Sequence, residues 1–230
     1  MKTIIAILGC LSLCSTIVAQ NESLTASYLH IDAGSDGLLQ MLARETGDPS
    51  FGDKLDEGPG LSIEWRNAYT NGTSFGLEYI NFGTEASVSG DLSAQGANEF
   101  NNLLGLSILQ AGATEVKEEY ATHTFMFNVA YDIEIGDKLD AYLGAGVGIS
   151  FLNQEISVSN PGFNDSSDDL DTVFSYQFKA GLRYALNEAW CVQGGVRYLD
   201  YGDFEFSPFG LKVEGDGDAT AFEFGLSYAY

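Results

Sequence analysis

Residues 172–201 read TVFSYQFKAGLRYALNEAWCVQGGVRYLDY, and they contain two alternating segments joined by a short turn. In the first segment, every second residue from Phe174 to Tyr184 is apolar or aromatic, and the residues between them are small, polar or basic. After the turn, the alternation resumes at Trp190. A period of two predicts β-strands with one apolar and one polar face. Each strand runs for about ten residues or more, a length that crosses a bilayer when the strand is tilted.

Alternation recurs in six other segments, so that eight strands are predicted in all; it is weak in the first of them, 24–32, whose faces it does not fix. The six are residues 24–32, 61–69, a strand from 73, 120–133, 138–151 and 220–230. Short turns at Asn71-Gly72, Gly136-Asp137 and Asn187-Glu188 alternate with long loops at 34–58, 83–117, 153–171 and 204–218. Within the second loop, apolar residues at helical spacing predict a short helix in residues 98–112. We therefore expect an all-β fold: an eight-stranded antiparallel transmembrane β-barrel with short periplasmic turns and four long extracellular loops.

The N-terminus has the pattern of a cleaved export signal. Lys2 supplies the positive charge, an apolar run follows, and Ala19 is a small residue at a plausible cleavage point. We expect residues 1–19 to be a signal peptide and residues 20–230 to form the barrel domain. Two of the three cysteines would leave with the signal, so Cys191 would remain alone and no internal disulfide is expected.

The chain is strongly acidic, with 10 Lys and Arg against 33 Asp and Glu and a formal net charge of -23. This balance argues against nucleic acid as a partner, because phosphate requires a basic surface. The acidic clusters at 165–169 and 214–218 have carboxylates that suit calcium, but neither has the register of a twelve-residue calcium loop. We interpret them as solvated loops, and we expect no metal site and no cofactor.

Two features indicate that the apolar face meets lipid, rather than lining a soluble ligand-binding barrel. Glycines such as Gly144, Gly146 and Gly148 crowd the polar face, where they would make room inside a narrow barrel. Aromatic residues with polar tips lie near the short turns on the apolar face, as in an interfacial girdle. The predicted girdle is Tyr69, Tyr131, Tyr184, Trp190, Tyr228 and Tyr230.

The polar face would place a set of charges inside the barrel. By parity this lumen charge network comprises Glu64, Arg66, Glu78, Lys179, Arg183, Arg197 and Glu223. A charge on the lipid face would cost roughly 2–4 kcal/mol near the midplane, whereas inward charges pair with one another. We expect the network to plug the lumen of so narrow a barrel, with a narrow ion path as the alternative.

Three segments resemble the OmpA-like family of outer-membrane β-barrels, which includes small porin-like proteins and surface antigens. They are DAYLGAGVGISF, the 172–201 hairpin and the terminal ATAFEFGLSYAY. The resemblance implies a Gram-negative outer membrane, with lipid and lipopolysaccharide around a monomeric barrel. It also implies that the barrel-assembly machinery reads the last strand, through Phe222, Phe224, Leu226, Tyr228 and Tyr230.

The function expected from these features is structural or interactive: envelope integrity, with loops that mediate adhesion or contact with a partner that the sequence does not name. A narrow porin-like channel for ions or small solutes is the alternative. An outer-membrane lipid-modifying enzyme is a remote third hypothesis. His30 and His123 are the only histidines, His123 is expected on the lipid face, and neither has a serine at a spacing that indicates a catalytic pair. No enzymatic activity is therefore expected.

Overall fold

The structure is a computed structural model that describes residues 21–35, 58–92, 94–103, 110–207, 209 and 212–230. These residues form one helix, α3 (Ala94–Leu103), and eight strands: β1 (Asn21–Ser35), β2 (Gly58–Ala68), β3 (Thr73–Leu92), β4 (Gly112–Gly136), β5 (Leu139–Asn160), β6 (Phe163–Ala185), β7 (Trp190–Phe206) and β8 (Val213–Ala229). No helix in this part of the chain is long and apolar enough to cross a membrane. The predicted signal peptide lies outside the described residues.

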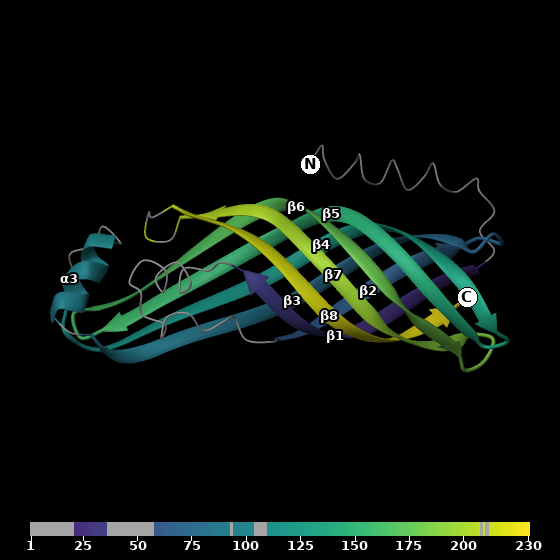
Figure 1. The fold of residues 1–230 in the computed structure, drawn as a ribbon, viewed down its shortest axis with the longest axis horizontal. Coiled ribbons are helices and arrows are strands. Elements are labelled where there is room, and N and C mark those ends of the chain that lie inside the picture. Colours follow the sequence, from purple (N-terminus) through teal and green to yellow (C-terminus); the bar gives the residue numbers. More distant parts are fainter. Residues whose placement is uncertain (1–20, 36–57, 93, 104–109, 208, 210–211) are drawn as a thin grey trace.

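The eight strands form a closed antiparallel barrel (Figure 1). Each strand pairs with the next, and β8 closes the ring by pairing with β1 in a register that places Leu24 opposite Tyr228. The predicted short turns lie together at one end of the barrel. In the first of them Gly72 adopts a φ of 81°, a conformation that glycine reaches without steric cost. The predicted eight-stranded antiparallel barrel is therefore confirmed.

The strands extend further than predicted at the opposite end. β5 and β6 pair through residues 153–171, with only Pro161 and Gly162 between them, so the prediction of a third long loop was wrong. Both ends of 83–117 are likewise strand, because β3 ends at Leu92 and β4 begins at Gly112. In 204–218, β7 and β8 leave only residues 207–212 as the connection. These segments are polar, but outside a membrane a strand tolerates polar residues on its outer face.

Two further connections complete this end of the barrel. The helix predicted within 98–112 is α3, which begins at Ala94 and ends at Leu103. Figure 1 shows β3 to β6 reaching past the other strands toward α3, so these four strands project furthest from the short turns. The first predicted long loop, 34–58, lies almost entirely outside the described residues.

The apolar face of the barrel changes side part-way along the strands. On β5, Leu143, Val147 and Ile149 point outward and are 56%, 50% and 50% exposed. Further along the same strand, Leu152 and Ile156 point inward and are 6% and 0% exposed. Adjacent apolar residues mark this switch on five strands: Tyr28-Leu29, Tyr79-Ile80, Phe151-Leu152, Val173-Phe174 and Tyr198-Leu199. The outer apolar belt therefore ends at the level where an inner apolar core begins.

Glycines inside the belt accommodate a large lumen side chain. Tyr142 on β5 lies opposite Gly181 on β6, which in turn lies opposite Gly195 on β7. A Cβ atom at either glycine would lie 2.6 Å from the Tyr142 hydroxyl. The missing side chains thus leave space for the ring of Tyr142, which is 2% exposed.

Candidate functional site

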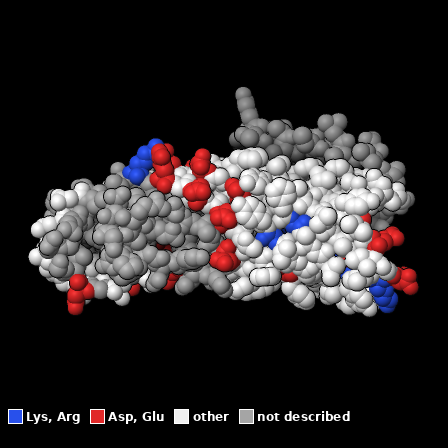
Figure 2. Space-filling view, in the orientation of Figure 1, with Lys and Arg blue, Asp and Glu red and all other residues white. Residues whose placement is uncertain are grey.

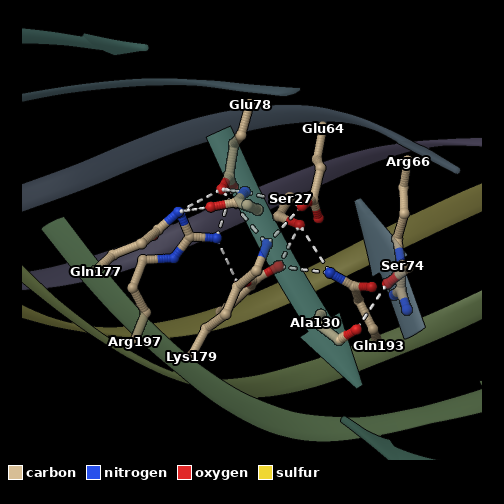
Figure 3. Close-up of polar contacts among 12 residues, drawn as sticks. Ser27, Glu64, Arg66, Ser74, Glu78, Ala130, Gln177, Lys179, Gln193 and Arg197 are labelled. Carbon is tan, nitrogen blue, oxygen red and sulfur yellow. Dashed lines mark hydrogen bonds and ion pairs between the residues drawn. The ribbon is translucent and has the colours of Figure 1, made fainter. Parts of the chain in front are cut away.

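The lumen charge network is centred on Glu78, whose carboxylate lies between two cations (Figure 3). One carboxylate oxygen is 2.7 Å from Nη2 of Arg197, and the other is 3.4 Å from Nζ of Lys179. Arg197 also reaches Glu223, at 2.7 Å. Gln177 donates to Glu78 at 2.8 Å and accepts from Arg197 at 3.1 Å. Four strands, β3, β6, β7 and β8, are joined by these contacts across the middle of the lumen.

A second set of contacts ties β2 and β4 into the same network. Lys179 donates to Glu64 at 2.8 Å, and the amide nitrogen of Asn128 donates to both Glu64 and Glu78, at 2.9 and 2.8 Å. On the opposite side, Gln193 and Ser27 donate to Glu223 at 2.5 and 2.8 Å. Each carboxylate of the network therefore accepts from charged and neutral donors together, which is the condition for stable burial of charge.

The remaining predicted lumen residues meet nearer the short turns. Arg66 and Arg183 both form ion pairs with Asp132 on β4, and the Arg183 pair is 3.0 Å long. The guanidinium of Arg183 also lies over the ring of Tyr142, 5.0 Å from its centroid. Asp132 thus links Arg66 and Arg183, two arginines that were predicted in the lumen without a predicted partner.

All seven predicted lumen residues point into the barrel, and they form two groups rather than one. Asp132 was missed, although it continues the inward parity of β4 from Asn128. With it, the two groups hold four cations and four carboxylates: Arg66, Lys179, Arg183 and Arg197 against Glu64, Glu78, Asp132 and Glu223. The formal charges of these eight side chains therefore balance. The amides of Asn128, Gln177 and Gln193 were also missed, because polar uncharged residues on an inward face carry no specific signal.

An apolar layer fills the lumen beyond the charge network. Between the two lies a chain of hydroxyls, in which Ser150 is 2.7 Å from Thr124 and 2.6 Å from Ser175. The buried apolar side chains then pack as one cluster: Leu29, Ile31, Ile80, Phe82, Met126, Leu152, Val173, Leu199, Tyr201, Phe204, Phe206, Ala219 and Ala221. This layer was not predicted from the sequence, because each strand was expected to keep the same apolar and polar faces along its whole length.

Comparison with known proteins agrees with this architecture. A family model described as outer membrane protein beta-barrel domain matches residues 6–229. The chain belongs to this outer-membrane barrel family. Protein opa of Haemophilus influenzae is 28% identical over 89 residues, which are 37% of this chain and 70% of that protein. As a member of the family, the protein is placed in the bacterial outer membrane, and its short turns face the periplasm.

Solved outer-membrane barrels match this chain at low sequence identity. The crystal structure of Neisserial surface protein A matches with a TM-score of 0.53 and 13% identity, covering 91% of this chain and 97% of that one. The crystal structure of Ail, the attachment invasion locus protein of Yersinia pestis, matches with a TM-score of 0.46 and 13% identity, covering 93% and 100% of the two chains.

The predicted girdle residues of this outer-membrane barrel lie at its periplasmic end. Tyr131, Tyr184, Trp190, Tyr228 and Tyr230 are 41–65% exposed on the outer face, and Tyr69 is partly buried. The ring centroids of Trp190 and Tyr228 are 4.8 Å apart, and those of Tyr69 and Phe75 are 5.8 Å apart. In the last strand, Phe222, Phe224 and Leu226 also face outward. The assembly signal predicted there is therefore an outward-facing row of side chains.

The histidine and cysteine side chains do not form a cluster in the described part of the barrel. Nδ1 of His123 is 2.7 Å from the Tyr79 hydroxyl and 3.1 Å from the Asn81 amide nitrogen, on the outer face at the end of the belt. Cys191 is a free thiol of intermediate exposure. Among the described residues, no group of three or more His, Cys, Asp and Glu side chains is arranged to hold a metal ion.

The outer face beyond the belt is acidic (Figure 2). Glu85, Glu119 and Glu155 lie opposite one another on β3, β4 and β5. Lys117 pairs with the first two, and hydrogen bonds to Glu119 and Glu85 raise the pKa of its ammonium group. Directly opposed like charges destabilise a sheet, so this cation offsets part of their repulsion. The predicted acidic loops, 165–169 and 214–218, are themselves strand segments of this surface.

Proposed function

We propose that this outer-membrane barrel has a structural and surface-contact role, with a lumen that conducts no ions. The observation that carries the proposal is the double closure of the lumen. Two groups of ion pairs, with four cations and four carboxylates between them, occupy the periplasmic part of the lumen, and a cluster of buried apolar side chains lies beyond them. An ion that crossed the barrel would have to separate buried ion pairs and then enter an apolar layer, and both steps are costly.

The contact role is supported by the part of the barrel beyond the belt. β3 to β6 project past the belt with an acidic outer surface, on which Lys117 lies between Glu85 and Glu119. We propose that this projecting half presents the barrel to partners outside the cell, while the belt anchors it. We assign two activities to the protein. The first is adhesion or contact through the projecting half, and the second is a contribution to envelope integrity.

The partners that we propose follow from the outer surface. Lipid and lipopolysaccharide would surround the apolar belt, and the barrel-assembly machinery would read the outward row of the last strand during insertion. We propose a monomer, since the eight strands close on themselves without an unpaired barrel edge in the belt. We assign no catalysis to His123, because it lies on the outer face with Nδ1 held by Tyr79 and Asn81.

The experiment that tests the closed lumen is single-channel recording from the refolded protein in a planar bilayer, alongside Arg197→Ala. Refolding is verified by heat-modifiable electrophoretic mobility. We expect no conductance from either protein, because the apolar layer remains when the network is disrupted. Steady small openings in the native protein would overturn the proposal in favour of a narrow channel, and a change of their ion preference in the variant would identify the network as its filter.

The envelope role is tested in cells. A strain that lacks the protein is compared with the same strain complemented by the native chain, and uptake of a large hydrophilic antibiotic or dye is measured. We expect higher uptake without the protein and restoration by the native chain. Equal uptake in both strains would contradict a contribution to envelope integrity, and adhesion assays with the same pair of strains test the contact role separately.

A further inference from the structure

The tip of the β7–β8 hairpin has no backbone ladder to β6, its neighbour on one side. The β6–β7 ladder ends where Tyr176 lies opposite Asp200, although both strands continue beyond this pair. On the other side, the described β8–β1 ladder reaches Ser35, the last described residue of β1. Residues 202–206 of β7 and 213–216 of β8 pair with each other. We call these two segments the hairpin tip. The ladder to β6 therefore stops below the hairpin tip.

A pair of glycines lies at the foot of the hairpin tip. Gly202 lies opposite Gly217, and the register of the two strands shifts between Asp200 and Gly202. Gly202 adopts a φ of 59°, and its amide donates to the carboxylate of Asp200 at 2.8 Å. A β-bulge with a glycine in the left-handed region bends a strand locally. Because neither glycine has a side chain, rotation of the backbone at this pair meets little steric resistance.

Side chains of β6 replace the missing ladder between β6 and the tip. Asp171 accepts from the amide of Glu205 at 2.7 Å, and Asp169 accepts from the amide of Ser207 at 2.5 Å. Farther out, the hydroxyl of Ser167 accepts from the amide of Phe209 at 3.2 Å. The three acceptors occupy every second position of β6 and form a latch. Such bonds at an exposed edge are individually weak, because water competes for the same donors.

The seam beside the latch is not closely packed. A hollow of about 900 Å³ lies along it, lined by residues 171–174 of β6 and by residues 203–205 and 214–216 of the tip. The inner face of the tip is deeply buried in contrast: Phe204 is 5% and Phe206 is 0% exposed. The ring of Phe206 is 6.0 Å from that of Tyr120 on β4. The tip thus places two aromatic rings into the outer end of the apolar layer.

We propose that the hairpin tip is a hinged lid over the outer mouth of the barrel. Gly202 and Gly217 are the hinge, the side chains of Ser167, Asp169 and Asp171 are the latch, and Phe204 and Phe206 are the stopper. Opening breaks the three latch bonds and withdraws the two rings, while the ladders below the hinge remain intact. The lid controls access from the exterior to the apolar layer. This lid goes beyond the proposed function, because the proposal of a lid does not depend on whether the projecting half binds a partner.

The test compares the reactivity of two buried positions on β7. The three native cysteines are replaced by serine, and a single cysteine is introduced as Phe206→Cys in the tip or as Leu199→Cys below the hinge. Both parent side chains point inward and are at most 3% exposed. The refolded barrels in lipid vesicles are reacted with a water-soluble maleimide, with and without the latch substitutions Asp169→Ala and Asp171→Ala. We expect the latch substitutions to raise the labelling rate at position 206 by about tenfold and to leave position 199 unchanged.

Asp168→Ala is the matched control for charge. It removes an exposed aspartate from the same strand segment without removing a latch bond, and we expect it to change neither rate. If the latch substitutions left position 206 as protected as before, or raised both positions together, the lid would be refuted. Hydrogen exchange of the chain with its native Phe206 provides a second measurement. Faster exchange confined to residues 203–206 and 214–216 in the latch variant is expected, whereas unchanged exchange there would also refute the lid.

Discussion

At the scale of single residues, the lumen depends on matched charges. Arg197 contacts Glu78 and Glu223, each at 2.7 Å, and its side chain is 1% exposed. Removal of one partner from a buried ion pair is more costly than replacement of the whole set by neutral groups, because the remaining charge stays desolvated. The order of stability among variants of this group therefore reveals whether the charges are buried as the structure shows.

We predict that Arg197→Ala lowers the free energy of unfolding by about 3–5 kcal/mol, because two carboxylates lose their shared cation. The measurement is urea unfolding in lipid vesicles, followed by tryptophan fluorescence. The triple variant Arg197→Met, Glu78→Gln, Glu223→Gln is the control, and it should be more stable than Arg197→Ala. The reverse order would contradict buried, coupled charges at this position.

A second prediction concerns two adjacent glycines on β7. Gly195→Ala should destabilise the barrel by about 1–3 kcal/mol, because overpacking forces neighbours to shift. The new Cβ would lie 2.4 Å from the backbone oxygen of Ala180 and 2.6 Å from the Tyr142 hydroxyl. Gly194→Ala is the matched control, since its Cβ meets its nearest neighbour at 3.8 Å. The same unfolding measurement applies, and equal effects of the two substitutions would argue against the close contact with Tyr142.

At the scale of elements, each long strand belongs to two environments. β5 runs from the belt, where Ile149 is 50% exposed toward lipid, to the projecting half, where Ile156 is fully buried. The shift from one parity to the other occurs at Phe151-Leu152, with no bulge in the pairing of β5 with β6. The switch is therefore made by the choice of residues, and the backbone continues unchanged through it.

This arrangement predicts different responses to aspartate along β5. Ile156→Asp should disrupt the projecting half, because it places a second buried carboxylate directly opposite the buried Glu118 of β4. Ser157→Asp should be tolerated, since Ser157 faces the other side of the strand and is only partly buried. Hydrogen exchange of β4, β5 and β6 measures both effects. Comparable protection in the two variants would contradict the burial of the inner face of β5 at Ile156.

At the scale of the whole molecule, the five switch pairs mark the outer limit of the membrane. Below them the outer surface is apolar, and beyond them it carries acidic groups such as Glu155 and Asp168. Charged side chains on a lipid-facing surface destabilise a barrel, so an outer surface with carboxylates at this density lies in water. The net charge of -23 thus belongs largely to the part of the barrel outside the bilayer.

The depth of this limit can be measured directly. An environment-sensitive fluorophore attached at Phe151→Cys should report an apolar medium and be quenched by brominated lipid. The same fluorophore at Glu155→Cys, four residues farther along the outer face of β5, should report water and escape quenching. Native Cys191 is replaced by serine in both variants. If both labels reported the same medium, the limit of the belt would not lie between these positions.

Much of this architecture could be predicted from local patterns. Alternation between Phe174 and Tyr184, and again from Trp190, predicted both the hairpin and its lipid-facing side. The inward parity of Lys179 and Arg197 predicted charges in the lumen. The outer ends of the strands were missed, because a strand that leaves the membrane loses its apolar outer face and its residues then resemble those of a loop. Residues 153–171 are the clearest example.

The number of strands, the faces of the belt and the export of the chain follow from the sequence alone, because a period of two is a local property that needs no partner. The contacts of the lumen needed the closed barrel. Lys179 meets Glu64 across 115 positions of the chain, and Asp132 joins two arginines only when β2, β4 and β6 surround one axis. The latch between β6 and the hairpin tip arises in the same way, from register and closure. Such pairings are set by the curvature of the whole sheet, which no single segment encodes.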